Sequence, residues 1–408
     1  PVLTRLYTPA NFGVLAAYAS LIGILSVAAS LRYELAIPLP RDETSALNLL
    51  ALTVALVAMS SASWALVVVG VGSDVVRALR VPMLEPYLPL VPLGVLFVGA
   101  YQALSYWAIR QAAFGLIART KIVQGVGSAA VQVGFGVAAS GAGGLLLGSI
   151  VGQAAGGRSL AHPLWIARAS TVRALSPGHM RLVAGRYRRF PIYSTGASIL
   201  NSLGVFAPAL LLASLYGIRV AGWFALADRV SRMPLNLIGS AVGQVYLSRA
   251  ATLAREAPAA LLALYLRSTR HLLVVGTALV GATAALAPIL FPVIFGSAWK
   301  TAGTYTALLA AMLVAQFVFN PLSQTLYVLE EQALAMVLDA ARAVVAVSAL
   351  AVPHSLGLSA SWAVACFSLA MAAMYAVYWV VALQRLCSYA VARAASLGPG
   401  CGRRGSAA

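Results

Sequence analysis

Long apolar runs, separated by short polar or basic segments, recur along the whole chain. Each run reaches roughly 20 residues, the length that a helix needs to cross the hydrocarbon core of a bilayer. A helix satisfies all its own backbone hydrogen bonds there. The pattern predicts helices at residues 12–37, 46–72, 86–108, 122–140, 143–166, 190–215, 220–247, 271–295, 302–329, 333–352 and 357–384. We therefore expect an all-α polytopic membrane protein.

The first nine residues, PVLTRLYTP, resemble the end of a helix whose beginning is missing. With the eleven apolar segments, this stub predicts twelve helices in the intact protein. We expect two six-helix lobes around a central cavity, with the first helix largely missing from this chain. The predicted parts are an N-terminal lobe (1–166), a basic cytoplasmic linker (167–189), a C-terminal lobe (190–384) and a cytoplasmic tail (385–408).

A short internal repeat supports this division. Residues 6–16 and residues 215–225 share the pattern L-Y-x5-G-x2-A, at an offset of 209 positions. Both copies lie where a short loop enters an apolar helix. Parallel repeats of this kind occur in transporters, which often place the substrate between the two halves.

Composition and charge agree with a membrane protein. The chain is 61% hydrophobic and only 9% charged, whereas soluble domains have about 25% charged residues. If the residues near Pro9 face outward, 19 of the 28 basic residues fall in inward regions and five in outward ones. This distribution follows the positive-inside rule. The net charge of +18 therefore indicates contact with anionic membrane lipids, and nucleic acid is excluded as the expected partner.

Four basic residues remain, all inside apolar segments: Arg32, Arg229, Arg232 and Arg342. An arginine at the bilayer centre costs about 2.5–3.5 kcal/mol on insertion scales, so it usually faces a water-filled cavity or a partner. Three acidic residues accompany them: Glu34, Asp228 and Asp339.

The spacing of these charges leaves two interpretations open. Asp228 and Arg232 are four residues apart and Asp339 and Arg342 three, so each pair can meet on one helix face. These acids, with Glu34, are candidates for coupling or for structural ion pairs. Glu34 is only two residues from Arg32, and on a straight helix these side chains diverge.

The alternative interpretation is a cationic cavity for an anionic substrate. Arg229 and Arg32 have no obvious local partner and are the stronger candidates, ahead of Arg232 and Arg342. Arginine suits phosphate or diphosphate because its planar fork makes bidentate, charge-assisted hydrogen bonds. Pro234, just beyond Arg232, frees a carbonyl and is a possible hinge.

Other chemistry is not indicated. The sequence has no metal-ligand spacing, nucleophile elbow or phosphate-binding glycine loop. The three cysteines and four histidines form no ligand pattern. We expect no catalytic residues, no metal and no cofactor, and hence a protein that is not an enzyme.

Several stretches resemble the Wzx-type lipopolysaccharide and O-antigen flippases, which are polysaccharide-biosynthesis members of the multidrug/oligosaccharidyl-lipid/polysaccharide (MOP) exporter superfamily. The similar stretches are LTRLYTPANFGVLAAY (3–18), SLRYELAIPLP (30–40), LSYWAIRQAAFGLIARTKIVQG (104–125), RYRRFPIYS (186–194), LYGIRVAGWFALADRVSRMPLNLIGSAVGQVYLSRAA (215–251) and NPLSQTLYVLEEQ (320–332).

This resemblance implies movement of an undecaprenyl-diphosphate-linked oligosaccharide across the bacterial inner membrane by alternating access. Such a protein serves the assembly of lipopolysaccharide or another surface polysaccharide. The resemblance implies that Arg32, Arg229 and Arg232 meet the diphosphate. Candidate protein partners are a polysaccharide polymerase and chain-length proteins.

Two other functions stay open from the sequence. One is a cation-coupled multidrug or small-molecule antiporter of the same superfamily, which would be expected to keep acidic residues in an otherwise neutral cavity. The other is a membrane polysaccharide polymerase, although no large outward loop is evident for a catalytic domain.

Overall fold

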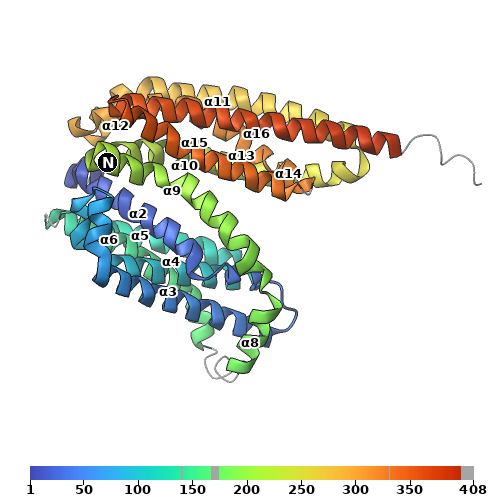
Figure 1. Cartoon of the computed structure of the whole chain (residues 1–408), viewed down its shortest axis with the longest axis horizontal. Helices are drawn as coiled ribbons and strands as arrows, with labels where there is room; N and C mark the ends of the chain where they lie inside the picture. The colour runs from blue at the N-terminus through green and yellow to red at the C-terminus, as the bar shows by residue number, and fades with distance from the viewer. Residues whose placement is uncertain (139–140, 167–173, 330, 397–408) are drawn as a thin grey trace, which may run out of the picture. The chain divides into compact units, whose positions relative to one another are not determined.

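The computed structural model describes residues 1–138, 141–166, 174–329 and 331–396, and every regular element within them is helical (Figure 1). In this part of the chain, seven helices are long and apolar enough to cross a membrane. A further pair, Ser297–Leu308 with Ala310–Val328, is bent by 52° and would make an eighth span. The predicted all-α polytopic membrane fold is therefore confirmed, while the total of twelve helices stays a prediction.

The chain divides into two compact units. The first unit contains Pro1–Ala225 and Ile294–Ala298, and the second contains Leu226–Val293 and Trp299–Ala408. The boundary falls inside one long helix, α10 (Ile218–Glu256). The lobe boundaries expected from the sequence stay a prediction, and the tail beyond residue 396 lies outside the described residues.

The first unit is a helical bundle that also contains the beginning of α10. Its other long helices are α2 (Pro9–Ala29), α3 (Glu43–Ala78), α4 (Leu90–Arg110), α5 (Phe114–Val137), α6 (Gly143–Ile166) and α9 (Thr195–Tyr216). Its shorter helices are α1 (Val2–Leu6), α8 (Pro177–Arg186), η1 (Tyr33–Ala36), η2 (Pro82–Tyr87) and η3 (Phe190–Ser194). The closest helix pairs are α5 with α6, α2 with α9, and α3 with α4.

Small residues at every fourth position bring α5 and α6 together. Gly148, Gly152 and Gly156 of α6 lie directly against α5. A methyl group at Gly156 would come within 2.5 Å of Gln124 Cγ, and one at Gly152 within 2.9 Å of the Gln124 carbonyl oxygen. Such close backbone approach is the usual means of helix association in lipid, where the hydrophobic effect between helices is absent.

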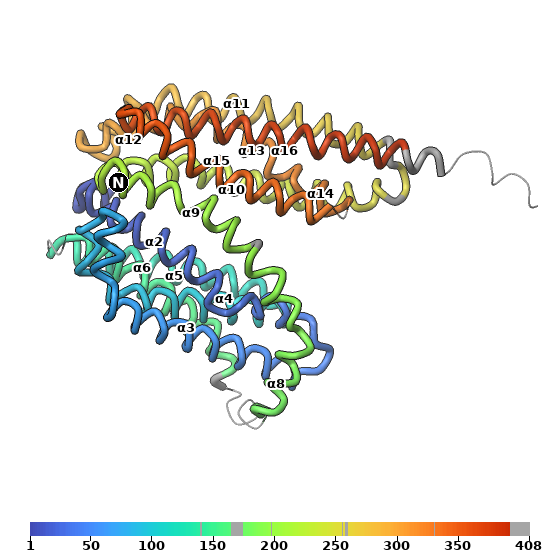
Figure 2. The backbone as a smooth tube through the Cα atoms, viewed as in Figure 1, coloured from blue at the N-terminus to red at the C-terminus, as the bar shows by residue number. Residues whose placement is uncertain are grey.

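The described part of the basic linker packs on the first unit. Asn48 of α3 donates to the Ala174 carbonyl at 2.8 Å and accepts from the Ser176 amide at 2.9 Å. The Tyr33 hydroxyl donates to the Ala184 carbonyl at 3.0 Å, so α8 lies beside the connection between α2 and α3 (Figure 2). The first part of the predicted linker, 167–173, lies outside the described residues.

The second unit is built from the rest of α10, most of α11 (Pro258–Phe295) and five further α-helices. These are α12 (Lys300–Leu308), α13 (Ala310–Leu322), α14 (Gln324–Val328), α15 (Gln332–Ser355) and α16 (Ala360–Ser396). Helix α16 packs against α13 and α15. Two hydrogen bonds tie it to α11: Tyr265 Oη donates to the Trp379 carbonyl, and Trp379 Nε1 donates to Thr269 Oγ1, each at 3.0 Å.

The two copies of the sequence repeat lie against each other within the first unit. Their glycines, Gly13 of α2 and Gly222 of α10, occupy a point where the two backbones touch. A methyl group on Gly13 would lie 1.8 Å from the Ile218 carbonyl oxygen, and one on Gly222 would lie 1.8 Å from the Pro9 carbonyl oxygen. Only glycine fits at either position, which explains why both repeat copies carry it.

We expect Gly222→Ala to destabilise the protein markedly. The added methyl group would collide with backbone atoms of α2, which cannot rotate away as a side chain does. Overpacking typically costs about 1–3 kcal/mol and sometimes more. A fall in the midpoint of thermal unfolding of the purified protein would show this.

The matched control is Gly70→Ala in α3, where no atom lies within 4 Å of the added methyl group. Alanine is favoured over glycine inside a helix by about 0.5–1 kcal/mol, so this variant should be unchanged or slightly more stable. Equal midpoints for Gly222→Ala and Gly70→Ala would contradict the close contact.

Candidate functional site

The second unit contains a cavity of about 440 Å³ between α10 and the α13–α14 segment. Its walls are formed by Arg232, Leu235, Asn236, Gly239, Ser240, Gly243, Gln244, Leu247, Leu313, Gln316, Phe317, Asn320, Pro321 and Gln324. Arg232 is the one charged residue in this lining. Half of the described lining residues are polar, and apart from the one guanidinium these polar groups are uncharged.

The polar lining residues form two stripes. On α10 they follow one another at intervals of four residues: Arg232, Asn236, Ser240 and Gln244. On α13 and α14 the interval is also four: Gln316, Asn320 and Gln324. Residues four apart lie on the same face of a helix, so each helix presents one polar stripe to the cavity.

Gly239 and Gly243 leave room beside the α10 stripe. A methyl group on Gly243 would make only ordinary contact with Pro321, at 3.6 Å from its Cα. The nearest atom to a methyl group on Gly239 is a ring carbon of Phe317 at 4.0 Å. The space between α10 and α13 therefore depends on the absence of larger side chains at these two positions.

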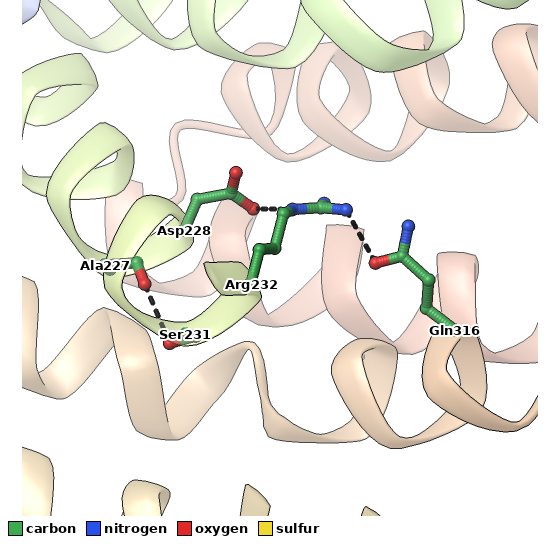
Figure 3. A network of polar contacts seen from close by, with 5 residues as sticks. All are labelled: Ala227, Asp228, Ser231, Arg232 and Gln316. Atoms are coloured by element: carbon green, nitrogen blue, oxygen red, sulfur yellow. Dashed lines mark hydrogen bonds and ion pairs between the residues drawn. The ribbon is translucent and has the colours of Figure 1, made fainter. Parts of the chain in front are cut away.

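Arg232 lies at one end of the α10 stripe, held between two partners (Figure 3). Its Nε donates to Asp228 Oδ1, one helical turn earlier, and its Nη1 donates to Gln316 Oε1 at 2.6 Å. The predicted Asp228–Arg232 pair is thus confirmed. The pair is partly exposed, 29% for Arg232 and 26% for Asp228, so the guanidinium is oriented by Asp228 but still open to the cavity.

The second predicted pair, Asp339–Arg342 on α15, is also formed. Arg342 Nη2 lies 3.3 Å from Asp339 Oδ1, and Tyr378 of α16 donates to the same oxygen at 2.6 Å. Arg342 interacts with the phenol of Tyr375 as well. Arg342 is close enough to Arg232 for their charges to interact, but it is outside the cavity lining. The second unit thus brings two acid–base pairs into one region.

Arg229 is exposed and makes no ion pair or hydrogen bond with any described side chain. It precedes Asn236 by seven residues, almost two full turns, and so lies on the same face of α10 as the polar stripe. Its side chain extends that stripe beyond Arg232. The expectation that Arg229 has no local partner therefore holds for the described residues.

Arg32 differs from the sequence-based expectation in two respects. The predicted helix 12–37 ends at Ala29, because Leu31 and Arg32 take left-handed backbone angles (φ 50° and 61°). The turn brings Arg32 Nη1 to 3.1 Å from Glu34 Oε1. The expectation that these two side chains diverge was wrong, because it assumed a straight helix. Arg32 has a local acidic partner.

Glu34 is almost completely buried, with 1% of its side chain exposed. Ser30 Oγ donates to its other oxygen, Oε2. The two charges and the hydroxyl therefore make a compact polar turn inside the first unit.

The candidate hinge and the possible metal ligands can also be located in the described residues. Pro234 lies within α10, which continues without interruption across it. No group of three or more potential metal-ligating side chains occurs among the described residues.

The first unit has its own cavity of about 220 Å³, bordered by Tyr18, Phe97 and Phe206 among others, and none of its described lining residues is charged. Of these two cavities, that of the second unit alone has a charged residue in its described lining.

The amides of this cavity were missed by sequence reasoning that followed charges alone. Asn236, Gln244, Gln316, Asn320 and Gln324 are five of the 15 asparagine and glutamine residues in the chain. Their spacing of four or eight residues within apolar segments was a usable signal. Which two stripes face one cavity could be learned only from the packing of α10 on α13.

The family model of polysaccharide biosynthesis proteins matches residues 2–304. The chain belongs to this family. No curated protein sequence matches it.

Solved structures share its fold. A multidrug resistance MATE family transporter of the MOP superfamily, in an inward-facing conformation, has a TM-score of 0.70 at 13% identity, with 95% of this chain and 94% of that chain covered. The lipid II flippase MurJ, in an inward closed conformation, has a TM-score of 0.66 at 11% identity, with 96% and 86% covered. The polysaccharide biosynthesis protein thus has the fold of MOP-superfamily transporters and flippases.

Proposed function

We propose that this protein is a flippase for undecaprenyl-diphosphate-linked oligosaccharides. It moves them by alternating access from the cytoplasmic to the periplasmic leaflet of the bacterial inner membrane, for the assembly of lipopolysaccharide or another surface polysaccharide. The observation that carries the proposal is the cavity of the second unit, where a single arginine stands at one end of a wall of uncharged polar groups. The family match and the fold shared with a lipid II flippase support the same class of substrate.

Arg232 is suited to hold a diphosphate. Asp228 binds its Nε edge and fixes the plane of the guanidinium. Gln316 occupies Nη1 with a neutral amide oxygen, which a charged phosphate oxygen can replace at a gain in electrostatic energy. The Nη1–Nη2 edge then offers the parallel donors that match a phosphate group.

Arg229 supplies a second, uncompensated positive charge one turn before Arg232. From residue 228 to residue 232, two arginines and one aspartate give a net charge of +1. In this proposal Arg229 binds the same diphosphate. Arg342, outside the cavity lining, adds to the positive electrostatic potential around it.

Glu34, Asp228 and Asp339 hold arginines in place, and Asp228 and Asp339 remain candidates for coupling to an ion. The substrate role of Arg32 is weaker in this scheme, because Glu34 already offsets its charge. Pro234 remains a candidate hinge, since it removes one hydrogen bond from α10 just beyond Arg232.

A cation-coupled multidrug antiporter is the alternative, and the similarity of the fold to a MATE transporter favours it. Such a protein needs an acidic group that is free to bind a cation. In this structure Asp228 and Asp339 each contact an arginine, and neither lines the cavity. The lining therefore favours an anionic, hydroxyl-rich substrate.

Reconstitution of the purified protein in vesicles tests the proposal. Undecaprenyl-diphosphate-linked oligosaccharide is placed in one leaflet, and its appearance in the other is measured with an impermeant sugar-modifying reagent. Protein-dependent movement is expected for this lipid. Export of a cationic dye that depends on Asp228 or Asp339, without movement of the lipid, would favour the antiporter.

Filling the cavity should block this movement. Gly243→Leu places three additional carbon atoms beyond the β-carbon, toward α13. We expect the transport rate to fall about tenfold or more, the factor that corresponds to 1.4 kcal/mol of lost binding. The vesicle assay measures it.

The matched control is Gly243→Ala, whose methyl group makes only ordinary contact with Pro321. It should transport at nearly the wild-type rate. If the leucine variant does the same while folding normally, the substrate does not pass through this cavity.

A further inference from the structure

The cavity of the second unit is longer than one diphosphate needs. From Arg232 to Gln244, the α10 stripe covers twelve residues, which correspond to about 18 Å along a helix. Its charge is confined to the Arg232 end, and every other polar lining residue is an amide or a hydroxyl. The far part of the wall therefore offers uncharged hydrogen-bonding groups to a ligand that enters the cavity.

The hydrogen-bonding capacity of this wall is largely unused. Gln316 gives its oxygen to Arg232 and keeps its amide hydrogens. The side chains of Asn236, Gln244, Asn320 and Gln324 line the cavity without a hydrogen-bond partner among the described residues. In a membrane-spanning unit, polar side chains are costly unless they meet water, a partner or a ligand.

Amide side chains match sugars better than they match phosphates. Each has a carbonyl oxygen that accepts and an NH₂ group that donates, and a sugar hydroxyl needs both. Phosphate oxygens only accept, and they gain most from cationic donors such as arginine. Arg232 lies at one end of the α10 stripe, and the amides of that stripe follow from one turn to more than three turns away. This is the order expected for a charged linkage followed by a carbohydrate.

We propose that Asn236, Gln244, Asn320 and Gln324 form a carbohydrate subsite that binds the first sugars of the lipid-linked oligosaccharide. The subsite rests on the proposed function, in which Arg232 binds the adjoining diphosphate. It gives the second unit a direct role in recognising the sugar end of the substrate, and the two polar stripes contact opposite sides of the sugar ring.

A binding experiment with two lipids tests the subsite. The probes are undecaprenyl diphosphate and undecaprenyl-diphosphate-linked N-acetylglucosamine, titrated against the full-length protein in lipid nanodiscs. Wild-type protein should bind the glycosylated lipid about tenfold more tightly or better, because one or two added hydrogen bonds of about 1 kcal/mol each account for about this factor. The double variant Gln244→Ala/Asn320→Ala should lose this preference and keep its affinity for the bare lipid.

Gln384→Ala is the matched control, since it removes an exposed amide that does not line the cavity. It should retain the preference. The subsite is refuted if wild-type protein binds both lipids equally, or if the double variant binds both more weakly by the same factor. A wild-type protein that binds neither lipid would instead refute the proposed function, and the subsite with it.

Discussion

Replacing Arg232 by alanine is expected to lower the rate of lipid-linked oligosaccharide translocation by about one to two orders of magnitude. Hydrogen bonds to charged groups contribute about 1.5–3 kcal/mol, and 1.4 kcal/mol corresponds to a factor of ten. Among the described residues, Arg232 is the one charged group in the cavity lining, so the variant leaves Arg229, outside that lining, as the remaining cation proposed for the diphosphate. The vesicle assay measures the rate, and restoration of surface polysaccharide in a strain without its own flippase gives the cellular equivalent.

Two further variants distinguish geometry from charge at this position. Arg232→Lys keeps the charge but loses the planar fork that binds phosphate at two points, so an intermediate rate is expected. Arg77→Ala is the matched control, because it removes an arginine whose partner Asp74, at 2.6 Å, is highly exposed. Surface pairs of this kind contribute little to stability, and transport should be unchanged.

Loss of folding must be separated from loss of binding. Arg232→Ala leaves Asp228 without its cation, although the carboxylate is partly exposed and water can compensate in part. The double variant Asp228→Asn/Arg232→Ala removes this unpaired charge and should recover the stability of the wild type. Transport should stay low in the double variant. Wild-type transport by Arg232→Ala at equal protein levels would exclude Arg232 from diphosphate binding.

The sequence was sufficient to locate most of the membrane-spanning segments and the ion pairs within one helix. Apolar runs of membrane-spanning length predicted the helical segments, since a bilayer permits little else. The pairs Asp228–Arg232 and Asp339–Arg342 followed from spacing alone, because helix geometry fixes which residues share a face. Both pairs are present in the structure.

Features that depend on irregular backbone or on tertiary packing were not predictable. The apolar run through residue 37 gave no sign that α2 ends at Ala29, because neither Leu31 nor Arg32 is a residue type that favours a left-handed turn. The contact between Gly13 and Gly222 brings together positions 209 apart. The facing of two amide stripes likewise requires the packing of α10 on α13.

Replacing Arg32 by alanine is expected to destabilise the protein by several kcal/mol. The variant leaves Glu34, whose side chain is 1% exposed, with Ser30 as its remaining partner. Removing one member of a buried ion pair typically costs about 3–5 kcal/mol, because the other charge stays buried without compensation. Thermal unfolding of the purified protein should show a clearly lower Tm, with reduced amounts of protein in the membrane.

The partner substitution separates a structural role of Arg32 from a substrate role. Glu34→Gln should cost less, since the remaining arginine is 22% exposed and can reach water. Because Arg32→Ala/Glu34→Gln leaves no unpaired charge, its Tm should exceed that of Arg32→Ala alone. If Arg32 serves only the turn, transport by the double variant should recover along with its Tm. If Arg32 also holds the diphosphate, the double variant should fold but still transport poorly. A wild-type Tm for Arg32→Ala would contradict the buried pair itself.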